Sequence, residues 1–165
     1  MSTGSKTKLE QKIGEALGLE MAAQKAVQEL DSKGLLDEAG MKAKLDKMRK
    51  EASNHQKAWR IGSEAVTVTR MNSESIQKSA EETEQKASQM MNTYLGEDPD
   101  SSEAIEFLCL AEGGEVTHYE VLSTMAAKKV KNKQFSTAVN SILREERRHL
   151  QLCSRLAKQL AATSE

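Results

Sequence analysis

The chain has 165 residues, of which 38% are hydrophobic, 30% are charged and 3% are aromatic. This length suits a single domain with its own core, and the scarcity of aromatic residues favours helices over a sheet. The net charge of −1 argues against nucleic acid and anionic membranes as partners, because both are bound by a clear excess of positive charge.

Apolar residues recur at helical spacing in five segments of the chain, at about 7–33, 37–62, 73–95, 101–130 and 135–162. The first segment opens with Thr7 and Glu10, which have the spacing of a capping box, and Gly34 offers it a C-cap. We expect this segment to pair with the second as an antiparallel hairpin. The β-branched residues at 66–69 are too isolated to form a strand, so they predict an extension of the second helix or a bend.

The third segment is a thin amphipathic helix that we expect to cross over between two hairpins. Gly96 and Pro99 break the chain after it, and Asp100 with Glu103 has the spacing of a capping box for the fourth segment. A helix of about 22 residues covers about 33 Å, so it can return the chain along a bundle and leave the second and fourth segments parallel. The predicted fold class is therefore all-α: one domain, residues 1–165, with a four-helix bundle of two antiparallel hairpins and an additional crossover helix.

Polar residues interrupt the apolar stripe of every long helix near its middle. Seven of them are candidate metal ligands: Glu20, Glu51, His55, Glu115, His118, Glu146 and His149. They include all three histidines of the chain, and the last two long helices each contribute a Glu-x-x-His motif. In an antiparallel hairpin, residues equidistant from the loop meet. Glu115 and His149 are equidistant from residue 132, and the same holds for His118 and Glu146, so the two motifs are expected to face each other.

Burying these carboxylates and imidazoles requires compensation, since an unpaired buried charge costs on the order of several kcal/mol. Divalent metal ions provide it, because carboxylate oxygens and neutral imidazole nitrogens bind them directly. Facing Glu-x-x-His motifs with carboxylates from the other helices predict a site for two divalent ions, iron or manganese. The alternative is a metal-free polar layer that sets the register of the bundle, in which Glu115 pairs with His149 and Glu146 with His118.

At these residues the chain resembles the ferritin-like superfamily of carboxylate-bridged dimetal proteins. The resemblance rests on the pattern of helices and ligands and covers essentially residues 6–162. Within it, VTHYEVLSTMA, from Val116 to Ala126, is similar to a helix of the YciE/YciF-type stress proteins. The resemblance implies a ferritin-like bundle, a homodimer, and oxidation of Fe(II) or reduction of peroxide or O2 at the buried site.

The chain also departs from the pattern of that superfamily. Glu51 and His55 are four positions apart in the sequence, where a spacing of three positions is usual. Both spacings place the two side chains on one face of a helix. His118 stands where the superfamily usually offers a carboxylate, and Glu112 or Glu120 could take its place.

Three functions are therefore compatible with the sequence. In a dimetal oxidoreductase, Tyr119 or Tyr94 could take part in redox steps, although ordinary packing also explains both side chains. A metal-free interaction bundle would use the methionines of the crossover region, Met71, Met90 and Met91, against a partner. The third function is that of a subunit of an iron-storage cage, for which the pattern offers no additional C-terminal helix.

The remaining signals concern the compartment. The first residues, MSTGSKTKLEQ, lack the apolar stretch of a secretion signal, and no segment approaches the roughly 20 apolar residues of a membrane span. Cys109 and Cys153 are far apart and have no CxxC spacing, so we expect reduced, buried thiols and no disulfide. Together these signals predict a cytoplasmic protein.

Overall fold

The computed structural model describes residues 3–38, 40–65, 71–130 and 132–163, and these residues are almost entirely helical. The helices are α1 (Thr3–Ser32), α2 (Met41–Ala65), α3 (Ser73–Leu95), α4 (Ser101–Met125) and α5 (Lys133–Thr163), with a π-helical turn, η1 (Ala126–Val130), at the end of α4. No strand occurs among the described residues, so the all-α class is confirmed. The predicted extension or bend at 66–69 lies outside them. None of the helices described is long and apolar enough to cross a membrane.

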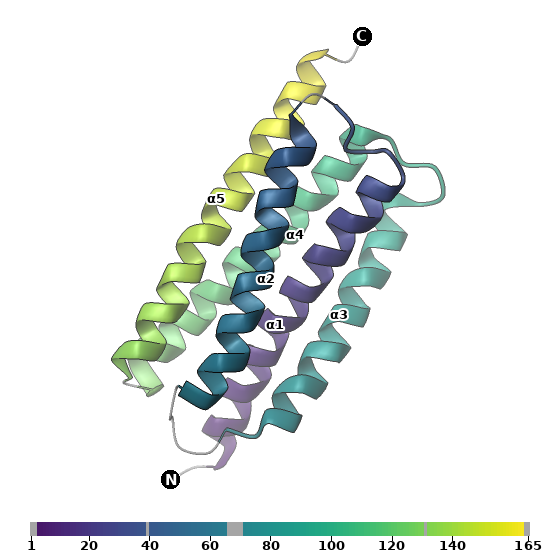
Figure 1. The fold of residues 1–165 in the computed structure, drawn as a ribbon. Helices are drawn as coiled ribbons and strands as arrows, with labels where there is room; N and C mark the ends of the chain where they lie inside the picture. The colour runs from purple at the N-terminus through teal and green to yellow at the C-terminus, as the bar shows by residue number, and fades with distance from the viewer. Residues whose placement is uncertain (1–2, 39, 66–70, 131, 164–165) are drawn as a thin grey trace.

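The helices lie side by side with their axes roughly aligned (Figure 1). Helices α1 and α2 form one antiparallel hairpin, and α4 and α5 form the other. Helix α3 returns the chain along the outside of α1, so that α2 and α4 run in the same direction.

Two predicted helix starts are wrong. Helix α1 begins at Thr3 and passes through the predicted capping box at Thr7. Glu10 has a different role, because its Oε1 accepts a hydrogen bond from the backbone N–H of Asn72 at 2.8 Å and so ties α1 to the start of α3. Helix α2 begins at Met41, not at residue 37, since Gly40 has a φ of 80°, a left-handed conformation that a helix cannot contain.

Other local predictions are confirmed. Asp100 and Glu103 form the predicted capping box of α4, in which each side chain accepts a hydrogen bond from the other residue's backbone N–H. Gly34 has a φ of 73°, the left-handed conformation of a C-cap. Both cysteines are free: Cys153 is buried, as predicted, whereas Cys109 is only half-buried.

The core consists of two apolar clusters with a polar layer between them. One cluster, at the end of the bundle where α1 ends, includes Leu30, Leu45, Leu108 and Leu156. The other, at the end where α1 begins, includes Leu17, Trp59, Tyr119 and Val139. On each of α1, α2, α4 and α5, the residues of the two clusters are separated along the helix by buried Glu or His residues. The bundle therefore surrounds these polar groups with apolar layers on both sides.

Close contact between α1 and α3 depends on two glycines four residues apart. A Cβ atom added to Gly14 would lie 2.5 Å from the carbonyl oxygen of Ile76, and one added to Gly18 would lie 2.7 Å from Cβ of Thr83 and still closer to the carbonyl oxygen of Ala80. Because backbone atoms cannot move away as a flexible side chain can, these two positions fix how near α3 lies to α1.

We therefore expect Gly18→Ala to destabilise the protein by about 1–3 kcal/mol, the usual cost of overpacking, although alanine is the better helix former. Gly113 is a matched control, because it is also helical and an added Cβ would meet nothing within 4 Å. Gly113→Ala should stabilise the protein by up to about 1 kcal/mol through helix propensity alone. Urea unfolding of the two variants measures both effects. Equal stabilisation by the two substitutions would contradict the close packing of α3 on α1.

Candidate metal centre

Six ionisable side chains are buried in the layer between the two apolar clusters. They come from all four long helices and none is more than 5% exposed: Glu20, His55, Glu112, Glu115, Glu146 and His149. Each lies on the stripe of its helix that faces the centre of the bundle, a stripe that elsewhere carries buried apolar residues such as Leu17, Ala52 and Leu143. An isolated group of this kind would be strongly disfavoured, so the way these six compensate one another decides what the layer can do.

Glu146 is at the centre of the cluster and lies between the two histidines. Nδ1 of His55 is 2.9 Å from its Oε1, and Nδ1 of His149 is 3.4 Å from its Oε2. Oε1 of Glu20 lies 3.0 Å from the same nitrogen of His55, and Oε2 of Glu112 lies 3.6 Å from that of His149. The two imidazole rings are stacked, with centroids 6.2 Å apart.

Two groups of possible ligands follow from this geometry. Glu20, His55 and Glu146 form one group, and Glu112, Glu146 and His149 form the other. In each group, one oxygen or nitrogen from every residue lies within 4.8 Å of the others, and all the residues are buried. Glu146 belongs to both groups. The arrangement could hold two metal ions with one carboxylate between them.

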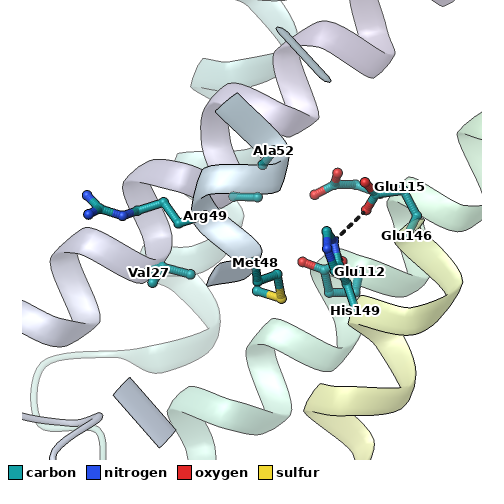
Figure 2. Close-up of a pocket in the computed structure, with 9 residues that line it drawn as sticks. Val27, Met48, Arg49, Ala52, Glu112, Glu115, Glu146 and His149 are labelled. Carbon is teal, nitrogen blue, oxygen red and sulfur yellow. Dashed lines mark ion pairs between the residues drawn. The ribbon is translucent and has the colours of Figure 1, made fainter. Parts of the chain in front are cut away.

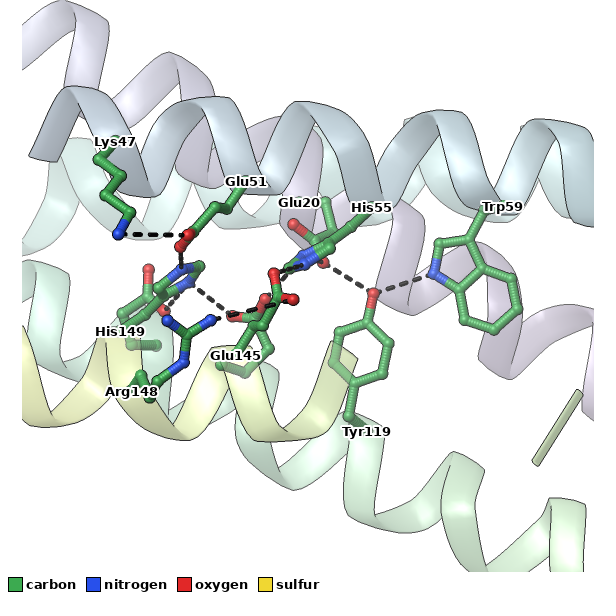
Figure 3. A network of polar contacts seen from close by, with 11 residues as sticks. Glu20, Lys47, Glu51, His55, Trp59, Tyr119, Glu145, Arg148 and His149 are labelled. Atoms are coloured by element: carbon green, nitrogen blue, oxygen red, sulfur yellow. Dashed lines mark hydrogen bonds and ion pairs between the residues drawn. The ribbon is translucent and has the colours of Figure 1, made fainter. Parts of the chain in front are cut away.

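The outer nitrogen of each imidazole is bound by a carboxylate at the edge of the layer (Figure 3). Nε2 of His149 is 2.7 Å from Oε2 of Glu51, and Nε2 of His55 is 2.8 Å from Oε2 of Glu145. In the neutral form of each ring, such a contact keeps the proton on Nε2 and leaves Nδ1 free to face the centre.

The electrostatics of the layer are unusual because carboxyl groups outnumber the cations. Burial raises the pKa of Glu20 to about 7 and that of Glu112 to about 8. Burial, together with the neighbouring charge of Glu146, raises the pKa of Glu115 well above its ordinary value. These carboxyl groups therefore hold protons at pH values where exposed glutamates are ionised.

The pKa values of Glu146 and of the two histidines shift in the direction opposite to the one that burial alone would produce. Burial disfavours every charged form, but the two adjacent imidazolium groups lower the pKa of Glu146 to about 2. Likewise, burial would lower the pKa of each imidazole, but the carboxylates beside them raise it to about 10 for His55 and about 11 for His149. In the absence of any other cation, these three residues form a charged row from imidazolium through carboxylate to imidazolium.

Several oxygens of the layer have no hydrogen-bond partner. They are Oε2 of Glu20, Oε2 of Glu112 and both carboxylate oxygens of Glu146, which the imidazoles approach without hydrogen-bond geometry. A cavity of about 10 Å³ lies beside Glu112 and Glu146. It is lined by these two residues, Glu115 and His149 on one side and by apolar side chains such as Val27 and Met48 on the other (Figure 2). A space of this size suits about one water molecule or small ion and excludes an organic substrate. Unpartnered carboxylate oxygens and neutral imidazole nitrogens are ligands that iron and manganese accept, so the residues fit these ions.

The structure brings together most of the residues singled out from the sequence. Glu20, His55, Glu115, Glu146 and His149 all lie in the buried layer. Glu51 is at its edge, with 21% of its side chain exposed, and contacts the layer through His149.

His118 is the exception, and its predicted place in the layer is wrong. It is half-buried at the side of α4, with Nε2 3.5 Å from Oε2 of Glu15 and Nδ1 bonded to the carbonyl oxygen of Gly114 at 2.9 Å. Glu112, one of the two alternatives considered, is buried in the layer, whereas Glu120 is exposed and pairs with Arg147 at 2.8 Å.

Helical rotation explains this error. Three residues rotate a helix by about 300° and four by about 400°, so only steps that alternate between three and four stay on one face. Two successive steps of three, from Glu112 to Glu115 and on to the predicted ligand His118, turn about 120° away from the starting direction. The buried stripe continues from Glu115 to Tyr119.

The predicted register of the second hairpin is wrong for a related reason. His149 approaches Glu112 and not Glu115, and Glu146 pairs with His55 and not with His118. Residues at equal distance from the loop meet only where both helices stay regular α-helices up to it, whereas residues 126–130 form a π-helical turn, which contains more residues per turn.

Sequence reasoning missed Glu145 as a partner of His55, and it left the role of Tyr119 open. Nothing in the local pattern around Glu145 indicates that it reaches across to α2. Tyr119, by contrast, is fully buried and donates a hydrogen bond to Oε1 of Glu20 at 2.7 Å, and strict alternation of three- and four-residue steps would have found its position. Tyr94 lies elsewhere, half-exposed against Phe107.

Comparisons with known proteins find no family model, no curated protein and no solved structure that matches this chain.

Proposed function

We propose that the protein is a ferritin-like bundle that binds two divalent metal ions, iron or manganese, in the layer around Glu146. The observation that carries the proposal is the pair of three-residue groups that share this carboxylate. Its support lies in the buried oxygens that lack hydrogen-bond partners and in the four helices that each contribute to the layer. The arrangement of α1, α2, α4 and α5, with α3 as the crossover, agrees with the ferritin-like connectivity.

In this proposal each imidazole binds metal through Nδ1. Glu51 and Glu145 hold the Nε2 protons of His149 and His55, so the inner nitrogens are the ones available. Glu146 would serve both positions, and Glu20 and Glu112 would each complete one of them. The apolar clusters above and below exclude bulk water from the layer. Bound iron would supply redox chemistry, namely the oxidation of Fe(II) or the reduction of peroxide or O2.

The main competing function is a metal-free bundle with a structural polar layer. It is favoured by the row of Glu146 and the two histidines, whose opposite charges already compensate one another. It does not explain why three more carboxyl groups, those of Glu20, Glu112 and Glu115, are buried beside this row. Burial raises the pKa of each of them, so that they hold protons. A homodimer and an iron-storage cage are two further proposals, which the mass of the protein in solution distinguishes.

Elemental analysis tests the metal proposal directly. We expect the protein purified without added metal to carry iron or manganese, and the chelated protein to take up two ions per chain when Fe(II) is added anaerobically, one for each group. His149→Ala should lose at least one of the two ions. His118→Ala, which alters a histidine outside the layer, should keep both. If the wild-type protein takes up neither Fe(II) nor Mn(II), the structural polar layer is the correct interpretation.

A further inference from the structure

We infer that Trp59 and Tyr119 form a positioning chain that holds Glu20 in place for a metal ion, and that this chain makes the Glu20 group the tighter of the two metal positions. The inference deepens the proposed function and rests on it. Neither residue is itself a ligand in this proposal, since each acts through Glu20.

The direction of the chain is fixed by the chemistry of its members. Nε1 of Trp59 donates to the hydroxyl oxygen of Tyr119 at 2.9 Å, and this hydroxyl donates to Oε1 of Glu20 at 2.7 Å (Figure 3). An indole N–H can only donate, and a phenol has a single proton, so the proton of Tyr119 is directed at Glu20. Packing holds the pair in place. Tyr119 is fully buried, and the ring of Trp59 stacks on the ring of Tyr119 and makes an edge-on contact with the ring of Phe135.

Tyr119 matters most when the adjacent imidazole binds metal. Nδ1 of His55 lies 3.0 Å from Oε1 of Glu20, but this nitrogen must be unprotonated to bind an ion and then has no proton to donate. Tyr119 is then the donor that still holds Oε1. Oε2 of Glu20, which has no hydrogen-bond partner, is the oxygen left for the ion.

The second group has no equivalent support. Among the described side chains, Glu112 approaches only His149 as a possible donor, at 3.6 Å, and its Oε2 has no hydrogen-bond partner. When His149 uses Nδ1 for an ion, Glu112 loses that contact. The cavity is lined by Glu112 and His149 and not by Glu20 or His55, so the Glu112 carboxylate borders unfilled space. A carboxylate that must be ordered on binding gives a weaker site than one already held in place.

Stepwise titration of the chelated protein with Co(II) tests the inference. Visible absorption reports Co(II) coordination, and the fluorescence of Trp59, the only tryptophan of the chain, reports the Glu20 group. For the wild type we expect two binding steps, with the change in fluorescence complete after the first. In Tyr119→Phe, the first step should weaken by about 10- to 100-fold, the range found when an outer-shell partner is removed. The second step should keep its affinity. The change in fluorescence should then no longer be complete before the second ion binds.

Two further variants complete the test. Tyr94→Phe removes a hydroxyl from a half-exposed tyrosine far from the layer and should leave both steps unchanged. Binding to Trp59→Phe is measured by absorption alone, and this variant should weaken the first step less than Tyr119→Phe does. It replaces Tyr119→Phe in the test if that variant fails to fold. Equal affinities of the two steps in the wild type, or equal weakening of both steps in the variants, would overturn the positioning chain while leaving the metal proposal intact. Absence of Co(II) binding to the wild type would overturn both.

Discussion

Glu146→Gln should abolish the stabilisation that added metal gives to the protein. In the wild type, metal at 100 times its dissociation constant stabilises the folded state by about 2.7 kcal/mol for each site, which corresponds to a rise in melting temperature of about 5–10 °C for a chain of this length. Glu146 is the one residue common to both groups of ligands, so its loss affects both ions. Thermal unfolding of wild type and variant, each with chelator and with Mn(II), measures the difference.

The same variant should also be less stable in chelator. Glu146 lies between His55 and His149, and without its charge the two imidazolium groups face each other with no central anion. Removing one partner of a buried charged pair typically costs about 3–5 kcal/mol. His118→Gln, outside the layer, is the control that should retain the full metal-dependent rise. If the wild-type melting temperature does not change with Mn(II) or Fe(II), no metal site exists and only the effect in chelator remains.

The metal-free protein should be most stable near pH 4–5 and lose stability steadily as the pH rises. The folded pKa values of Glu20 and Glu112, about 7 and about 8, lie above the ordinary value of 4.5, so the stability that these groups contribute is lost as pH rises through 7–8. His55 and His149 act in the same sense, since their folded pKa values of about 10 and 11 lie above 6.5. Glu146, with its pKa lowered to about 2, contributes stability above 4.5 that is lost as pH falls through 2.

Bound metal should reverse this dependence. An ion requires ionised carboxylates and neutral imidazoles, so binding releases the protons that the layer holds and becomes tighter as pH rises. We expect the difference in melting temperature between Mn(II) and chelator to be small at pH 5.5 and largest at pH 8–8.5. Differential scanning calorimetry across this range separates the two curves. A metal-free stability that increases between pH 5 and pH 8 would show that the buried carboxyl groups do not hold protons in the folded state.

The sequence by itself determined the helices and most of the polar layer. Helical periodicity depends only on neighbouring residues, so the five helical segments and the capping box at Asp100 followed from local spacing. The same periodicity identified Glu20, His55 and Glu146 as polar residues on an apolar stripe, because a helix places residues three or four apart on one face whatever surrounds it.

Only the tertiary structure decided how these stripes meet. The π-helical turn before α5 and the rotation of α4 about its axis place Glu112 in the layer, bury Tyr119 in the apolar cluster next to it, and leave His118 at the side of the layer. Glu145 contacts His55 across 90 positions of the sequence, and no local rule relates them. Register between helices depends on the sum of many weak contacts and on the backbone at each loop, whereas periodicity within a helix is set by its own hydrogen bonds. For this reason the sequence could show which helices carry the polar layer, but not which of their side chains lie opposite one another.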